Sequence, residues 1–476
     1  MGAPRAVTFA VTLSSLCILC TVSGCADREL APLGEVLVVV DTDLPVPRVA
    51  SALRVDTYAS DGTWLESRDI ALRDPRDWPA SFSVQSADDL RERDVVVRLR
   101  IHGERVRDVV SGPRLVSDGR DVTPVSEPEP SLTVDRVLLL HLSPGRVGRT
   151  QVVARASCAG IAARLEPGAL ESCTSGEGTR ERVTVETPEP DLTTPRESLA
   201  GTAARTPCTV DPSIDRVCVE GGAFIVGADD VQVVPDADLP ATPERVARVQ
   251  SFAIDRDEVT VGRLRAALAR GFAPPEPPGA TEGDLGAAPE TACSFSASPR
   301  GREEFALSCV TWRTARAYCA FTGGDLPTEA QWEYAATSAA RAGKTMFPWG
   351  DEPPDCERAI YGRLTLAGLP GGCEKAWGSG PRPASIDGAP IAPGDVSASR
   401  VRGLGGGVAE WTRDTPARYD APCWRGIDPS CSDPTGEAHV LRGGAWASTA
   451  INVRSTARLA GAKPTSFIGF RCVYAR

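Results

Sequence analysis

The sequence predicts a protein of two folded domains, an all-β region of sandwich type followed by an irregular domain that mixes helices and strands (α+β). The chain has 476 residues, which is too many for one ordinary hydrophobic core. Its first half contains short runs of Val, Leu and Thr between Pro, Gly and Asp turns. Its second half alternates helical patterns with glycine-rich segments, so the two halves differ in class.

Composition excludes one class of partner. The net charge is -11 and the pI is about 5.1, whereas nucleic-acid binding needs a basic surface. Hydrophobic residues make up 42% of the chain, which is enough to build real cores. We expect an acidic globular protein with no nucleic-acid partner.

The N-terminus indicates the compartment. Arg5 precedes an apolar run over residues 6–22 that ends in Val22-Ser23-Gly24-Cys25. This pattern is that of a secretory signal with a lipobox over residues 1–24, and it resembles bacterial lipoproteins, in which the cysteine thiol is acylated. Cys25 is then the lipidation site, and residues 25–33 form a polar tether. The resemblance implies a membrane-anchored lipoprotein of the cell envelope, facing the periplasm or the surface; the alternative is a plain signal peptide with an incidental cysteine.

The other cysteines favour disulfides. The chain has 15 cysteines, and an even number remains once Cys17, Cys20 and Cys25 are set aside. Close neighbours along the chain suit local disulfide staples in a secreted protein. These neighbours are Cys158 and Cys173, Cys208 and Cys218, Cys293 and Cys309, Cys356 and Cys373, and Cys423 and Cys431. A zinc site is not expected, because there is no CxxC motif after the predicted signal and the histidines His102, His141 and His439 are scattered.

Residues 34–186 form the predicted β domain. Its strand-like runs, separated by turns, suggest an antiparallel sandwich of immunoglobulin-like type. His102 and His141 lie within these runs and are interpreted as strand-face residues. Residues 187–207 are rich in Pro, Thr and acidic residues without periodicity, which is typical of a linker.

Residues 208–476 form the second domain. A strand is expected over 217–227, a second over 249–254, and a helical pattern follows from residue 261. Another helix begins near Trp312 and ends at Gly323-Gly324, and the next has Thr328 as N-cap with Gln331 at capping-box spacing. The triplet at 405–407 is glycine, but no P-loop lysine follows it, so no phosphate site is predicted.

Seven sequence blocks in this domain carry a resemblance. In order they are GGAFIVG, DEVT, VTWRTARAYCAFTGGDLPTEAQWEYAA, FPWGD, GGVAEWTRD, RGGAW and GFRC. They resemble the formylglycine-generating enzyme family, also called the sulfatase-modifying factor family, over residues 208–476. The resemblance implies an irregular α+β fold of the C-type-lectin-like kind, low in regular secondary structure.

The resemblance also implies a chemistry that this chain lacks. In catalytic members, a pair of cysteines just after the RGG motif oxidises a substrate cysteine with copper and oxygen, and thiolate is the soft ligand that Cu(I) needs. Here residues 445–453 contain no cysteine, and Ser448 stands at the first cysteine position. We therefore predict no oxidase activity and no catalytic residue. The family's peptide groove remains a candidate ligand site, lined by Arg442, Trp446, Ser448, Asn452 and Arg454.

Other features implied by the resemblance survive in part. Cys319 and Cys472 match a structural disulfide of the family, whereas Ala336 and Ser455 stand where a second one is formed. A calcium-binding loop of the family has an asparagine at the position of Gly407, so Glu410 is only a weak calcium candidate. We interpret Glu410 as hydrogen-bonded in the core rather than as a catalytic acid, and no other cofactor is expected.

These observations leave three hypotheses. The first is a lipid-anchored, non-catalytic binding or scaffold module whose partner is a peptide or another envelope protein. The second is an enzyme with altered oxidative or maturation chemistry on a peptide. Its iron-dependent form is disfavoured, because those relatives bring a histidine cluster and this domain has only His439. The third is a component of a surface machine, similar to family-like lipoproteins of gliding bacteria.

Overall fold

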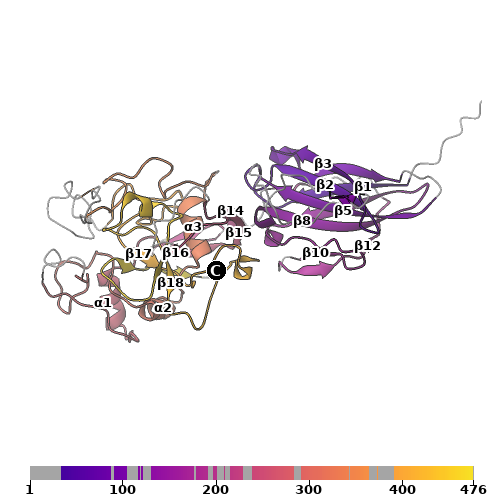
Figure 1. Ribbon diagram of the computed structural model, residues 1–476. Helices are drawn as coiled ribbons and strands as arrows, with labels where there is room; N and C mark the ends of the chain where they lie inside the picture. The colour runs from indigo at the N-terminus through magenta and orange to yellow at the C-terminus, as the bar shows by residue number, and fades with distance from the viewer. Residues whose placement is uncertain are drawn as a thin grey trace, which may run out of the picture.

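The computed structural model describes residues 34–86, 91–103, 116–117, 120–121, 130–175, 178–190, 197–200, 208–209, 215–228, 239–283, 291–341, 343–363, 373 and 391–474. The predicted signal, the tether, Cys25 and part of the predicted linker lie outside these residues. In the described part, strands predominate and helices are few. Figure 1 shows an N-terminal lobe of strands beside a C-terminal lobe that contains the α-helices.

The N-terminal lobe consists of strands joined by short 3₁₀ turns. These elements are β1 (Glu35–Thr42), β2 (Ala52–Ala59), β3 (Trp64–Ala71), η1 (Pro75–Asp77), β4 (Ala80–Gln85), β5 (Arg93–His102), β6 (Val116–Ser117), β7 (Arg120–Asp121), η2 (Pro130–Leu132), β8 (Thr133–Leu142), β9 (Val147–Ala154), η3 (Ala156–Cys158), β10 (Glu171–Cys173), β11 (Arg180–Arg182) and β12 (Val185–Glu186). One sheet has the order β4-β1-β9 and another β12-β8-β5-β2-β3. Both contribute to one hydrophobic core, as Val38 of β1 and Leu99 of β5 illustrate.

The prediction of an antiparallel arrangement does not hold for two strand pairs. β1 runs parallel to β9, and β12 runs parallel to β8. Alternation of apolar residues reports which face of a strand is buried, but it carries no information on the direction of a neighbour that is distant in sequence. The immunoglobulin-like type stays a prediction. His102 and His141 lie on β5 and β8, and their Nδ1 atoms are 2.7 Å from the Gly103 carbonyl and from an Asp94 carboxylate oxygen.

The C-terminal lobe has short elements linked by long irregular segments. They are β13 (Arg216–Val219), β14 (Gly222–Val226), β15 (Arg245–Val249), β16 (Phe252–Asp255), α1 (Val261–Ala269), α2 (Trp312–Phe321), α3 (Glu329–Thr337), β17 (Ala409–Trp411), η4 (Pro422–Trp424), β18 (His439–Arg442), η5 (Ala450–Val453), β19 (Arg458–Gly461), β20 (Ile468–Gly469) and β21 (Val473–Tyr474). The sheets are ordered β13-β16-β21, β14-β15 and β19-β18-β17-β20.

Local capping signals explain where the helices begin. The Thr328 hydroxyl accepts a hydrogen bond from Gln331 N (3.1 Å), and the Gln331 side chain accepts one from Thr328 N (2.9 Å). This confirms the predicted capping box at the start of α3. Gly323 follows α2 with φ +87°, a conformation that favours glycine, so it ends the helix where the sequence predicts.

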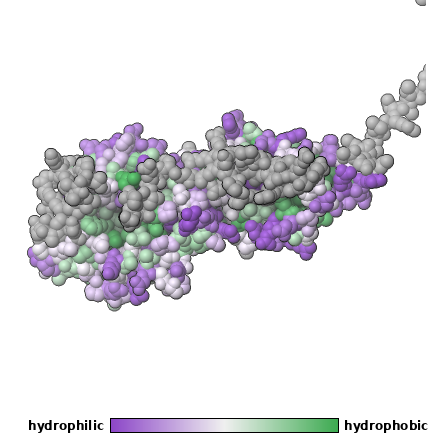
Figure 2. Space-filling model, viewed as in Figure 1, coloured by the Kyte–Doolittle hydropathy of each residue, from purple (hydrophilic) through white to green (hydrophobic). Residues whose placement is uncertain are grey.

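The molecular surface is mixed in polarity. In Figure 2, hydrophilic residues spread over both lobes on the face shown, and hydrophobic surface is confined to smaller patches between them. Within the part of the chain that the structure describes, no helix combines the length and apolar character needed to cross a bilayer.

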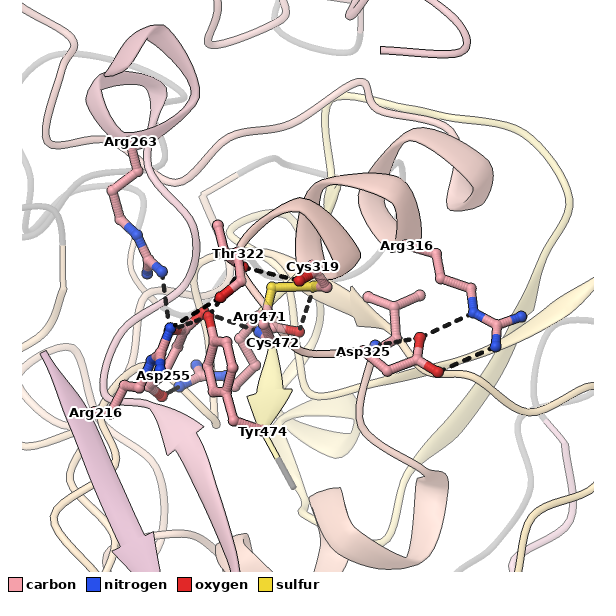
Figure 3. The surroundings of a disulfide bond; sticks show 11 residues. Arg216, Asp255, Arg263, Arg316, Cys319, Thr322, Asp325, Arg471, Cys472 and Tyr474 are labelled. Atoms are coloured by element: carbon pink, nitrogen blue, oxygen red, sulfur yellow. Dashed lines mark hydrogen bonds and ion pairs between the residues drawn. A yellow bond between two sulfur atoms is a disulfide. The ribbon is translucent and has the colours of Figure 1, made fainter. Parts of the chain in front are cut away.

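Both lobes contain disulfide bonds. The close cysteine pairs predicted from spacing are all bonded. Cys319 and Cys472 form a further bond with an S–S distance of 2.03 Å, across 153 residues of sequence. Figure 3 shows how it joins α2 to Cys472, the residue before the last strand, beside Asp255. The Asp255 carboxylate accepts hydrogen bonds from Cys472 N (2.9 Å) and from the Tyr474 hydroxyl (3.2 Å).

Removing the long-range disulfide should cost more stability than removing a local one. From loop-closure entropy, the expected stabilisation is about 5 kcal/mol for the bond that spans 153 residues. For Cys423–Cys431, which spans 8 residues, it is about 2.5 kcal/mol. We expect the double variant C319S/C472S to lose roughly twice as much unfolding free energy as C423S/C431S, measured by denaturant unfolding. Equal losses would contradict this ranking.

Candidate functional site

The segment after Arg442-Gly443-Gly444 forms a closed turn around Ser448. The Ser448 hydroxyl accepts a hydrogen bond from Ala445 N (2.9 Å), and Ser448 N donates to the Ala445 carbonyl (2.8 Å). On its outer side, the Ser448 carbonyl accepts from Gly362 N (2.8 Å). Ser448 therefore serves as the internal brace of a turn.

Two of the residues predicted to line a groove are buried instead. Trp446 is 2% exposed, its indole donates to the Ser466 carbonyl (3.2 Å), and its ring packs against Phe467. Arg442 is 0% exposed. The groove assignment is thus wrong for Arg442 and Trp446, because neither side chain reaches the surface. Ser448, Asn452 and Arg454 are partly exposed, with Asn452 on the η5 turn and Arg454 directly after it.

Arg442 is the centre of a buried ionic network. Its guanidinium donates to Glu329 (3.0 Å) and to Glu333 (2.6 Å), which lie one turn apart on α3. Arg458 of β19 also pairs with Glu329, and Lys344 pairs with Glu333 (2.8 Å). Burial alone would raise the pKa of Glu333, but the charges of Lys344 and Arg442 outweigh it and lower that pKa. Arg442, the arginine of the RGG motif, therefore fixes α3 to the sheet β19-β18-β17-β20.

A second buried cluster surrounds Glu410. Its carboxylate accepts hydrogen bonds from Arg471 Nε (2.7 and 2.9 Å) and from the Trp332 indole (2.8 Å). The prediction that Glu410 is hydrogen-bonded in the core is confirmed. These contacts do not fit a calcium ligand, because the carboxylate oxygens are already engaged and a guanidinium repels a divalent cation. The described residues contain no group of three or more His, Cys, Asp or Glu side chains that could hold a metal ion.

The glycine triplet in this cluster holds a carboxylate of the chain itself. Asp395 accepts from Gly405 N and Gly406 N (3.0 Å each), although burial raises its pKa to about 7. Glu258 accepts from Val408 N (3.1 Å), and its pKa is raised by burial and by the nearby Glu410. A Cβ at Gly407 would lie 2.7 Å from Glu258, so this position has no room for the family's asparagine without rearrangement.

A cleft of about 1040 Å³ opens on the side of the lobe where α2 and β18 begin. Trp312 stacks on His439 with ring centroids 3.8 Å apart, and the Arg316 guanidinium lies 5.2 Å from the Trp312 ring. Burial lowers the pKa of His439. A polar loop over residues 430–437 also lines the cleft. The polar lining residues include Glu276, Arg313, Arg413, Ser430, Asp433, Thr435 and Glu437. Sequence reasoning missed this cleft, since its walls come from separate segments and no local motif marks it.

Comparisons with known proteins agree on the C-terminal lobe. Residues 202–476 match the family described as sulfatase-modifying factor enzyme 1-like domain. A hercynine oxygenase of Mycolicibacterium smegmatis is 28% identical over 255 residues, which are 48% of this chain and 54% of that protein. A formylglycine-generating enzyme of Streptomyces coelicolor is 34% identical over 188 residues, 36% of this chain and 53% of that protein.

A shorter match concerns a protein named as inactive. The inactive C-alpha-formylglycine-generating enzyme 2 of Bos taurus is 43% identical over 53 residues, 11% of this chain and 17% of that protein. The chain therefore spans about half, or less, of the length of these curated relatives.

Replacing Arg442 should be severely destabilising. Arg442→Met leaves the buried carboxylates of Glu329 and Glu333 without their shared cation, a loss of about 3–5 kcal/mol. The matched variant Lys344→Met removes a cation from Glu333 at a side chain that is 23% exposed, so its cost should be clearly smaller. Denaturant unfolding would measure both, and an Arg442→Met variant as stable as Lys344→Met would contradict the role given to Arg442.

Asp395 should make stability depend on pH. Its pKa is about 7 in the folded chain against an ordinary value of 3.8. At pH values between these two, the folded chain therefore binds more protons than the unfolded chain. Its stabilising contribution is therefore present at low pH and is lost as the pH rises through about 7. The unfolding free energy of the wild type minus that of Asp395→Asn should fall between about pH 4 and pH 7 and level off above. A difference that stays constant over that range would rule out this titration.

Proposed function

The chain belongs to the sulfatase-modifying factor family, and on that basis we propose that it is a non-catalytic member that works as a binding or scaffold module at the cell envelope. One residue carries the proposal: the family resemblance implies that Ser448 stands at the first cysteine position, and its hydroxyl braces a turn. The relative named as an inactive enzyme is consistent with a family that includes members without activity.

The chemistry of the available side chains supports this proposal. Oxidation of a substrate cysteine by the family's route needs protein thiolates as soft Cu(I) ligands. A serine hydroxyl is a hard donor that stays protonated near neutral pH, so it cannot substitute. Every cysteine that the structure describes in the C-terminal lobe is in a disulfide. The residues present therefore do not fit copper at this loop.

We further propose that the mature chain is anchored by a lipid on Cys25 and presents the C-terminal lobe to a peptide or an envelope protein. The cleft beside Trp312 is the surface that suits such a ligand. Its volume of about 1040 Å³ is at the upper end of ordinary ligand pockets. The Arg313 side chain is exposed there and forms no ion pair with the residues that the structure describes, so it is free to meet a carboxylate of a peptide.

The absence of oxidase chemistry can be measured directly. We expect the purified mature chain, supplied with copper and a cysteine-containing peptide, to consume oxygen no faster than copper and peptide alone. A catalytic formylglycine-generating enzyme under the same conditions is the positive control. Robust copper-dependent turnover by this chain would overturn the proposal.

An enzyme with altered chemistry is the second candidate, because part of the chain resembles hercynine oxygenases. Metal analysis of the purified chain separates the two. A non-catalytic module should carry no stoichiometric iron or copper after purification. Tightly bound iron or copper near one equivalent would favour the enzyme.

A further inference from the structure

Strand β3 forms one edge of the larger N-terminal sheet. In the order β12-β8-β5-β2-β3 it pairs with β2, and no other described strand pairs with it; β6 lies close by but pairs with β7. Figure 1 shows β3 at the margin of the N-terminal lobe. Residues 65–69 are all exposed, and Leu65 is 47% exposed. The free edge of β3 is therefore open to a further strand.

Alternate residues of β3 turn their backbone groups toward this free edge. Leu72 N, just after the strand, donates to the Ser51 carbonyl (2.8 Å). Along an antiparallel pair, positions that exchange hydrogen bonds alternate with positions that do not, so Arg68 is bonded to β2 in the same way as Leu72. The backbone N–H and C=O groups of Ser67 and Asp69 point the other way, and no described backbone group pairs with them. These are the groups that a neighbouring strand would use.

The charges on β3 select one way to pair two copies. When two identical strands pair antiparallel about a twofold axis, outward-facing residues must meet outward-facing residues, so the axis passes through a residue rather than between two. An axis at Glu66, Arg68 or Asp69 places that charge opposite its own copy, which is destabilising. An axis at Ser67 places Glu66 opposite Arg68 twice, which is favourable. Neither of these two side chains forms an ion pair with the residues that the structure describes, so both charges are available.

The other positions fit the same register. Leu65 would face Asp69, whose carboxylate is already bonded to Arg54 (2.8 and 3.0 Å) and so brings no unpaired charge. The register between β2 and β3 shifts beside Leu65, which ends the regular ladder there and excludes an axis at that residue. Charges on an edge strand usually oppose pairing with another chain, but here they leave this one register open. We propose that β3 pairs with β3 of a second copy of this chain, antiparallel about a twofold axis at Ser67.

Sedimentation velocity of the mature chain tests this pairing, with Cys25→Ser to prevent association through a lipid. We expect a reversible dimer whose fraction grows with concentration. Glu66→Arg or Arg68→Glu alone should lower the association constant by about tenfold or more, because two attractive cross-strand pairs become repulsive. An equimolar mixture of the two variants should dimerise as well as the wild type, since a strand with two cations then meets a strand with two anions.

Two controls separate this register from a general effect of charge. Arg300→Glu makes the same charge change as Arg68→Glu at an exposed ion pair of the C-terminal lobe, so it should leave association intact. Amide exchange in the wild type should slow with concentration at Ser67 and Asp69 but not at Arg68, and this pattern decides if a variant fails to fold. The proposal is overturned by a wild type that stays monomeric up to about 1 mM, by unchanged association in Glu66→Arg, or by a mixture of the two variants that stays monomeric.

Discussion

The pairing of Arg442 with Glu329 and Glu333 is the interaction on which the C-terminal lobe depends. A lobe with so little regular secondary structure cannot rely on long hydrogen-bond ladders. Instead, a helix that carries two carboxylates on one face is fixed to a short sheet by a fully buried guanidinium. Arg471 and Glu410 form a second buried ion pair at the same sheet. The indole of Trp332, on the same helix, also donates a hydrogen bond to Glu410. Removing one partner of either pair leaves an unpaired charge in the protein interior.

This arrangement explains how the family's fold can persist in the non-catalytic member that we propose. The motif arginines, glycines and the Cys319–Cys472 bond all act in packing, so they remain necessary when the reacting thiols are gone. The turn at Ser448 is held by its own backbone and by Gly362, and it does not need a thiol or a metal to keep its shape. The interior that supports the site and the residues that would react there are physically separable.

Sequence reasoning succeeded where the cause is local. The capping box at Thr328 and Gln331 and the end of α2 at Gly323 depend on neighbours within a few residues, and the disulfides between close cysteines span at most 17 residues. It failed where the cause is a distant partner. Nothing near Arg442 shows that its carboxylates lie more than 100 residues upstream, and nothing in β1 shows that its parallel neighbour is β9. The cleft at Trp312 escaped for the same reason, since it is assembled from separate segments.

The most direct test of the claim that this fold has lost its reaction is mass spectrometry of a cysteine-containing peptide. The peptide is incubated in air with the mature chain and copper, and its cysteine is then assayed for conversion to formylglycine. A chain that offers Ser448 in place of a thiolate should leave the cysteine as thiol or disulfide only. Accumulation of formylglycine at a rate set by the concentration of the chain would contradict that claim.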